Sequence, residues 1–220
     1  MSTLYLVRHG QASAGTDNYD RLSPLGRQQA SLLGQWWQKQ GFTPELVCNG
    51  SLERQRDTAQ LAIEGLNDGI RRDEHADLDE YNHRQVDTHY GEGVQSDNPE
   101  SLTFDDYVGI MTRWRSAQSH PESVESWESF SNRGWQAIKN LCAKHNDSEH
   151  LAFFTSGGVI ATVISRVLDL EFHHTIDAIW RIRNASITTL HFDGENARLI
   201  DFNTVPHLQE HGDSSLITLI

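Results

Sequence analysis

Short apolar runs alternate with longer amphipathic segments along most of this 220-residue chain. Residues 3–7 and 151–155 are rich in apolar and β-branched residues without polar alternation, which is typical of strands buried on both faces. Between such runs, apolar residues recur at helical spacing, as Leu32, Leu33 and Trp36 do. The alternation predicts an α/β fold, a three-layer sandwich with a mostly parallel central sheet and helices on both faces.

Capping and turn residues set the expected boundaries of the elements. Strands are predicted at residues 3–7, 45–48, 70–75, 151–155, 186–192 and 198–202. Helices are predicted to begin at Ser23–Pro24, at Ser51 or Leu52, at Thr103 and after Ser126, and to cover residues 159–168. Residues 77–100 are polar, and we expect them to form a long loop.

Acidic residues dominate the charge of the chain. It holds 31 Asp and Glu against 18 Lys and Arg, a formal charge of −13. Such a field repels nucleic acid and anionic membrane surfaces, so we expect neither as a partner. A small anionic ligand would need positive charge concentrated in one site.

The cysteines and the N-terminal residues indicate the compartment. Cys48 and Cys142 have neither a CxxC nor a metal-ligand spacing, so we expect two buried thiols in a reducing environment. The apolar run at the N-terminus is too short for a signal peptide or a membrane span. We therefore expect a cytoplasmic protein that does not enter a membrane.

Small and polar residues follow two of the predicted strands. Arg8-His9-Gly10 follows the first strand and Ser156-Gly157-Gly158 follows the strand at 151–155, where ligands of α/β sheets bind. The charge of Arg8 lowers the pKa of His9, and its guanidinium can hold an oxyanion. Gly10 permits close approach of a ligand, and a helix beginning at Gly157 favours an anion. Taken alone, the triplet is weak evidence and favours a structural role.

The context of this triplet resembles a known family. The string RHGQASAGTDNYDRLSPLGRQQA resembles the opening of the histidine phosphatase superfamily, which includes the cofactor-dependent phosphoglycerate mutases. Residues 51–59, SLERQRDTA, are similar to the family's serine–arginine–threonine–alanine run, and Leu78-Asp79-Glu80 to its L-x-E. Residues 125–133, 184–186 and 206–208 continue the resemblance in order, so it covers nearly the whole chain.

The resemblance implies a role for each matched residue. His9 would be the nucleophile and Glu80 the general acid, while the groups expected to bind the phosphoryl oxygens are Arg8, Gly10, Arg54, Ser156 and Gly157. No metal and no other cofactor is implied. Ser156 departs from the pattern, because the family usually has a second histidine there. A serine hydroxyl donates one hydrogen bond but brings no positive charge, so we expect a slower or narrower enzyme.

The implied function is a metal-independent phosphomonoesterase that acts through a phosphohistidine on His9, on a small phosphorylated metabolite. Residues 1–220 would form one domain, with 79–135 as an insertion that caps the site. That insertion is acidic and has few basic residues for a second phosphate, which argues against a mutase. A phosphoglycerate mutase using 2,3-bisphosphoglycerate, or a phosphate-binding pseudoenzyme, remains the alternative, and self-association is left open.

Other polar residues carry weaker signals. The 12 histidines show no metal-ligand spacing. His83 and His89 would lie either at the mouth of the pocket or in a solvated loop. Arg181 and Arg183 would more readily face solvent than the site.

Overall fold

The computed structural model describes residues 1–13, 20–92 and 102–219. Within them lies a six-stranded sheet of order β3-β2-β4-β1-β5-β6. Its strands are β1 (Ser2–Arg8), β2 (Leu46–Asn49), β3 (Arg71–Glu74), β4 (His150–Thr155), β5 (Ile187–Phe192) and β6 (Ala197–Thr204). The first four run parallel, and β5 and β6 are antiparallel additions at one edge. The predicted mostly parallel sheet is confirmed, and each predicted strand is present.

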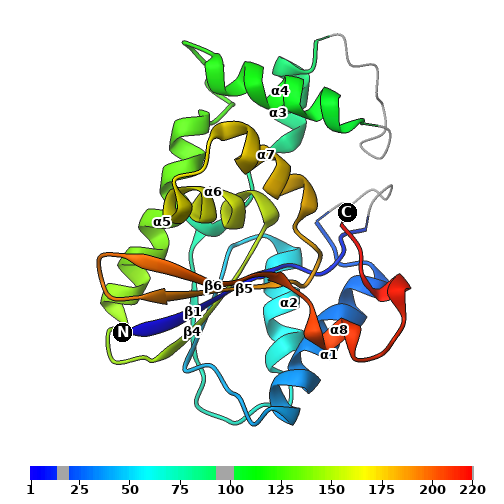
Figure 1. Ribbon diagram of the computed structural model, residues 1–220, viewed down its shortest axis with the longest axis vertical. Helices are drawn as coiled ribbons and strands as arrows, with labels where there is room; N and C mark the ends of the chain where they lie inside the picture. The colour runs from blue at the N-terminus through cyan, green and yellow to red at the C-terminus, as the bar shows by residue number, and fades with distance from the viewer. Residues whose placement is uncertain (14–19, 93–101, 220) are drawn as a thin grey trace.

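Helices cover both faces of the sheet (Figure 1). One face packs against α1 (Pro24–Lys39) and α2 (Glu53–Ile63), and the other against α5 (Trp127–Lys144) and α6 (Gly157–Leu168). Successive β1 side chains alternate between these layers: Leu4 and Leu6 join the α5–α6 core, whereas Val7 joins the α1–α2 core. This is why the strands carry continuous apolar runs. The three-layer sandwich is therefore confirmed.

Several predicted details of the helices and cysteines are also present. Pro24 is the first residue of α1, and the Ser23 hydroxyl caps the helix by accepting the Gly26 N–H at 3.0 Å. Cys48 and Cys142 are buried free thiols. None of the helices in the described ranges combines the length and the apolar character that a membrane crossing needs.

The expectation of a loop over 77–100 was wrong for its first half. A 3-10 helix (η1, Ala76–Leu78) is followed by α3 (His83–Tyr90), and residues 93–101 lie outside the described residues. Val86 is the buried residue of α3, so the segment has no apolar stripe to reveal it. The Asn82 side chain caps it by accepting the Gln85 N–H at 3.2 Å. Two further helices were not predicted, α7 (Phe172–Arg181) and the short α8 (Pro206–Gln209).

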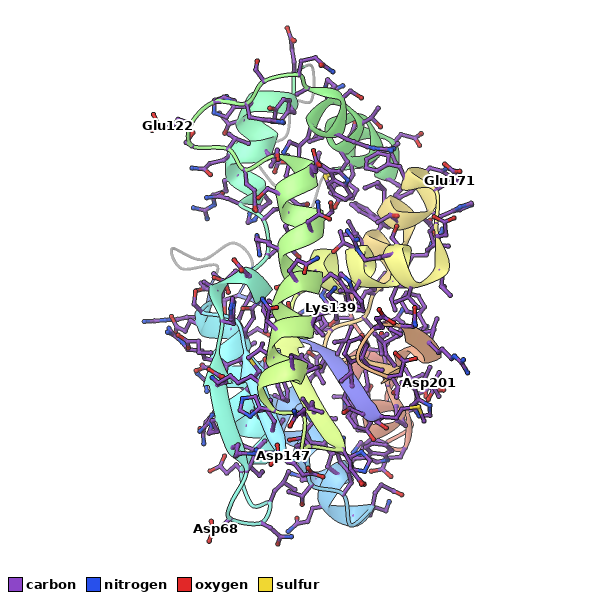
Figure 2. All side chains as sticks on the ribbon, turned by 90° about the vertical axis from the view of Figure 1, so that its left-hand side faces the viewer. Asp68, Glu122, Lys139, Asp147, Glu171 and Asp201 are labelled. Carbon is purple, nitrogen blue, oxygen red and sulfur yellow. The ribbon has the colours of Figure 1, made fainter. Side chains whose placement is uncertain are left out.

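A second apolar core lies beyond the sheet. It joins α3, α4 (Phe104–Ser116), the start of α5, α6 and α7 through a cluster rich in aromatic residues, with Tyr81, Tyr107, Trp114 and Phe130 among its members. Figure 1 shows α3 and α4 at one end of the molecule, with α7 between them and the sheet. Figure 2 shows α5, which carries Lys139, running from the end marked by Glu122 toward the end marked by Asp147. Helix α5 thus ties the two cores together.

The contact between α1 and α2 depends on a glycine. A Cβ on Gly34 would lie 2.6 Å from the backbone oxygen of Ala62. Gly34→Ala should therefore push the helices apart and lower the free energy of unfolding by about 1–3 kcal/mol. Urea denaturation followed by circular dichroism measures this quantity.

Gly109→Ala is the matched control. Gly109 also lies inside a helix, but its added Cβ would meet only the flexible end of Arg113, at 3.4 Å. Here the better helix propensity of alanine should raise the free energy of unfolding by about 0.5–1 kcal/mol. Equal losses in both variants would contradict the proposed close packing.

Candidate active site

The predicted site residues meet at the carboxyl ends of β1 and β4. Arg8 pairs with Thr155 in the parallel register, so His9 and Ser156 begin the loops that leave two neighbouring strands. The backbone of His9 is fixed on both sides, because its N–H donates to the Thr155 carbonyl at 2.9 Å and its own carbonyl accepts the Ala185 N–H at 3.2 Å. The sheet itself therefore positions the histidine.

The hydrogen bonds of the His9 ring define its tautomer. Nδ1 lies 2.7 Å from the Gly10 carbonyl oxygen, which can only accept, so Nδ1 carries the proton. Nε2 lies 3.1 Å from Nε of Arg54, which can only donate, so Nε2 holds a lone pair. The side chain is buried, with 4% of the residue exposed. Nε2 of His9 is thus unprotonated and faces the guanidinium of Arg54.

The surroundings keep this imidazole neutral. Burial lowers the pKa of His9 well below its usual value, and the charges of Arg54 and Arg8 lower it further, against a smaller opposing effect of the Gly10 carbonyl. The sequence pointed to the charge of Arg8, but burial is the larger cause. A neutral, correctly oriented imidazole is the state required of a nucleophile.

Arg54 is held in place from the first turn of α2. Its Nη1 donates to Oδ1 of Asp20 at 2.7 Å, and the other carboxylate oxygen of Asp20 accepts the Glu53 N–H at 2.8 Å. Thr58 accepts the Gly10 N–H at 3.0 Å and donates to the Arg54 carbonyl at 2.6 Å. Asp20 and Thr58 were not predicted as site residues. Thr58 could be recognised only as part of the matched run, and no sequence pattern near Asp20 indicates that it pairs with Arg54.

Arg8 lies beside the start of α6. Its Nη1 donates to the carbonyls of Ile182 and Leu219, and a Cβ added to Gly157 would come within 3.6 Å of its Nε. Gly157 is the first residue of α6, where backbone N–H groups have no acceptor within the helix. The positive charge of Arg8 therefore lies beside the positive end of the α6 dipole.

Glu80 reaches the same helix start from the loop after η1. Its Oε2 accepts the Gly158 N–H at 2.9 Å, and its Oε1 accepts the N–H of Tyr81 at 3.2 Å. Burial raises the pKa of Glu80, and these two N–H groups and the two arginines oppose that shift. A Cβ on Gly158 would lie 2.2 Å from Oε1, so glycine is needed there for the carboxyl group to fit.

Gly10 and Ser156 make packing and hydrogen-bond contacts that the sequence did not reveal. A Cβ on Gly10 would lie 2.4 Å from the Gly26 carbonyl oxygen, so the glycine is required by the packing of α1. Ser156 is fully buried at the start of α6, and its hydroxyl accepts a hydrogen bond from Nε2 of Gln55 at 2.8 Å. Gln55, which was not predicted, also donates to the Leu78 carbonyl at 3.1 Å. Gly10, Ser156 and Gly157 are not among the residues that line the cavity.

A cavity of about 150 Å³ opens above His9. Its floor is formed by Arg8, His9, Arg54 and Glu80. The wall contributed by residues 81–107 consists of Tyr81, His83, Asp87, Leu102 and Tyr107. Ile179, Trp180 and Leu219 complete the lining.

The remaining candidates lie outside the cavity, except for His83. His89 is exposed on α3. Arg181 pairs with Asp177 at 2.7 Å, and Arg183 donates to the Asn203 carbonyl at 3.0 Å. In the described ranges, no group of three or more His, Cys, Asp or Glu residues is arranged to hold a metal ion.

Solved structures of known proteins share this fold. Alpha-ribazole phosphatase from Shigella flexneri is 19% identical, with a TM-score of 0.64 over 92% of this chain and 96% of that one. Phosphoserine phosphatase from Entamoeba histolytica, solved as a histidine-to-alanine variant with phosphoserine, is 22% identical, with a TM-score of 0.65 over 94% of this chain and 100% of that one. Mycobacterial glucosyl-3-phosphoglycerate phosphatase is 23% identical, with a TM-score of 0.64 over 93% of this chain and 100% of that one.

The family follows from the sequence match. No curated protein matches the chain significantly. The model of the histidine phosphatase superfamily (branch 1), however, matches residues 4–205, from within β1 to the residue before α8. This range contains both strand ends that meet at His9, as well as the start of α2 and the loop of Glu80. The chain belongs to the histidine phosphatase superfamily, branch 1.

Proposed function

We propose that this protein is a metal-independent phosphomonoesterase that forms a phosphohistidine on His9 and acts on a small phosphorylated metabolite. The observation that carries the proposal is the His9 ring, which is neutral, carries its proton on Nδ1 and presents the Nε2 lone pair to Arg54, with the charge of Arg8 nearby. Such a ring attacks phosphorus without first losing a proton. The structural neighbours named as phosphatases of small phosphorylated molecules support the same substrate class.

In the first step, Nε2 of His9 attacks phosphorus in line while the ester P–O bond breaks. Arg8 and Arg54 balance the charge on the phosphoryl oxygens, with the Arg54 N–H that now contacts Nε2 redirected to an oxygen. The N–H of Gly157 adds the field of the α6 start. Protonated Glu80 gives its proton to the departing alkoxide.

In the second step, water replaces the alcohol. Glu80, now a carboxylate, takes a proton from the water as its oxygen attacks phosphorus, and the N–P bond breaks. Inorganic phosphate leaves, and His9 and Glu80 return to their starting states. The burial that raises the pKa of Glu80 suits it to exchange a proton in both steps.

Ser156 takes a supporting part in this proposal. We place it where most of the family has a second histidine, and its buried hydroxyl accepts a hydrogen bond from Nε2 of Gln55. The oxyanion contacts then rest on Arg8, Arg54 and the start of α6. Direct contact of Ser156 or Gly10 with the phosphoryl group stays a prediction.

We also propose that residues 79–135 act as a cap on one domain of residues 1–220, because the described part of this segment supplies much of the cavity wall. Among the described residues that line the cavity, the arginines are Arg8 and Arg54, and neither comes from the cap, which argues against a second anionic group such as that of a mutase substrate. A protein that only binds phosphate would need neither His9 as a nucleophile nor Glu80 as an acid, so their presence in one cavity argues against a pure binding role.

Phosphate release from p-nitrophenyl phosphate in excess EDTA tests the reaction. We expect release by the wild-type protein and none above background from His9→Ala, because the nucleophile is absent. His89→Ala, which removes an exposed histidine outside the cavity, is the control and should keep its activity. Release that EDTA abolishes, or that survives in His9→Ala, would contradict the mechanism.

If the wild-type protein releases no phosphate from any ester, it is not a phosphomonoesterase, and two alternatives remain to be tested. Interconversion of monophosphoglycerates in the presence of 2,3-bisphosphoglycerate would then identify a mutase. Phosphate binding without either reaction would identify a binding protein.

The protonation state of His9 can be measured directly. Imidazole ¹⁵N NMR, assigned by comparison with His9→Ala, should show a neutral ring with the proton on Nδ1 at pH 6.5. Because the pKa of His9 is lowered, the ring should gain its second proton only at a clearly lower pH. A midpoint near pH 6.5, or a proton on Nε2, would remove the basis of the proposed attack.

The role of Glu80 predicts a dependence on the leaving group. Glu80→Gln cannot donate a proton, so kcat/KM for an alkyl phosphate should fall by about 10²–10⁴-fold. The loss should be smaller for p-nitrophenyl phosphate, whose phenolate leaves without protonation. Glu122→Gln is the control, because Glu122 is exposed at the upper end of the molecule in Figure 2. Equal losses for both esters would show that Glu80 is not the acid.

A further inference from the structure

The cavity has a wall that the proposed chemistry does not use. Besides the arginines, the residues that line it include three aromatic ones, Tyr81, Tyr107 and Trp180, and the acidic Asp87. The tyrosines come from the loop before α3 and from α4, and the tryptophan from α7. Figure 1 shows these helices together at the same end of the molecule.

The aromatic part of this wall is fixed in position. The hydroxyls of Tyr81 and Tyr107 are hydrogen-bonded at 3.0 Å, so each phenol is oriented by the other. The ring centroids of Tyr107 and Trp180 are 5.2 Å apart. Tyr81 also packs on Trp114, with centroids 4.9 Å apart. Rings held this way need no ordering when a ligand arrives.

Asp87 brings a negative charge to the same wall. It is half-buried on α3, and its charge acts on both phenol groups. In the described part of the chain its carboxylate has neither an ion-pair partner nor a hydrogen-bond donor, although it lines a cavity. Burial raises the pKa of Asp87 to about 6, so it is mostly charged at neutral pH. A half-buried carboxylate without a cation is costly, and a ligand cation would relieve that cost.

The neighbouring titratable groups do not supply the missing cation. His83, on the same wall, has its pKa lowered to about 4 by burial and by the charges of Arg54 and Arg84, so its ring is neutral at pH 7. Arg8 and Arg54 face His9 on the floor and are engaged there. The cavity therefore has a cationic floor and a wall that is aromatic and anionic.

We propose that the leaving group of the substrate carries an ammonium group, which binds at the Asp87 carboxylate, beside the aromatic side chains of Tyr81, Tyr107 and Trp180. This inference rests on the proposed function and narrows its substrate class to short aminoalkyl phosphomonoesters. Aromatic rings attract ammonium groups, and a carboxylate beside them adds a charged partner. The phosphoryl group then meets the arginines while the ammonium meets Asp87, and a cavity of about 150 Å³ suits a short link between them.

Matched esters test this inference. Phosphocholine is compared with 3,3-dimethylbutyl phosphate, in which carbon replaces the charged nitrogen, and with glycerol 3-phosphate. The wild-type kcat/KM should be highest for phosphocholine. In Asp87→Asn the ratio of kcat/KM for phosphocholine to that for its carbon analogue should fall by about tenfold or more, the size of one charged contact.

Asp105→Asn removes the same charge from an exposed position of α4 outside the cavity, and it should leave the ratio unchanged. A fall in both variants would assign the effect to the overall field of the protein and overturn the inference. Hydrolysis of the neutral esters with no preference for phosphocholine, or a preference that survives in Asp87→Asn, would also overturn it and leave the proposed phosphatase intact.

If the wild-type protein hydrolyses none of the esters, the proposed function fails and binding decides the inference. Isothermal titration calorimetry on His9→Ala measures the dissociation constants of phosphocholine and of its carbon analogue. Tighter binding of phosphocholine that is lost when Asp87→Asn is added would support the ammonium site. Equal binding of the two esters would refute it.

Discussion

A buried imidazole that stays uncharged under the positive charges of two arginines is the constraint on which the rest of this site depends. The Gly10 carbonyl holds the proton on Nδ1, and Arg54 faces the free Nε2. The same arginines that suppress protonation of the ring form the cationic floor needed by an anion in a chain of charge −13. One pair of charges therefore adds to the effect of burial on the basicity of the ring and also supplies the local positive field.

Residues whose role depends on their own strand or helix could be predicted from the sequence. The apolar runs gave the central strands, and the small residues after β1 and β4 marked the edge where the site lies. Partners that meet only through tertiary structure could not be predicted. Asp20 on Arg54 and Gln55 on Ser156 are contacts between distant segments, and no local pattern reveals them. Gly10 shows the same limit, because the atom that excludes a side chain there belongs to Gly26.

The cap was harder to predict for a different reason. A helix is recognised by an apolar stripe, but α3 buries little beyond Val86 and uses its other residues for a cavity or for solvent. Its polar sequence therefore resembles that of a loop. Polar residues that line a cavity, such as His83 and Asp87, interrupt the apolar periodicity from which a helix is predicted.

Arg133 connects helix α5 with the segment that carries Glu80 and Tyr81. From α5 it pairs with Glu125 at 2.8 Å and donates at 2.7 Å to the carbonyls of both Asp77 and Asp79, just before Glu80. Tyr81, the next residue along, is already part of the aromatic wall. If Glu80 is the acid, as proposed, a change in the cap that admits a new leaving group also moves the group that protonates it. Specificity and rate would then change together, and a chimaera that exchanges the proposed cap should carry residues 77–133 as one piece.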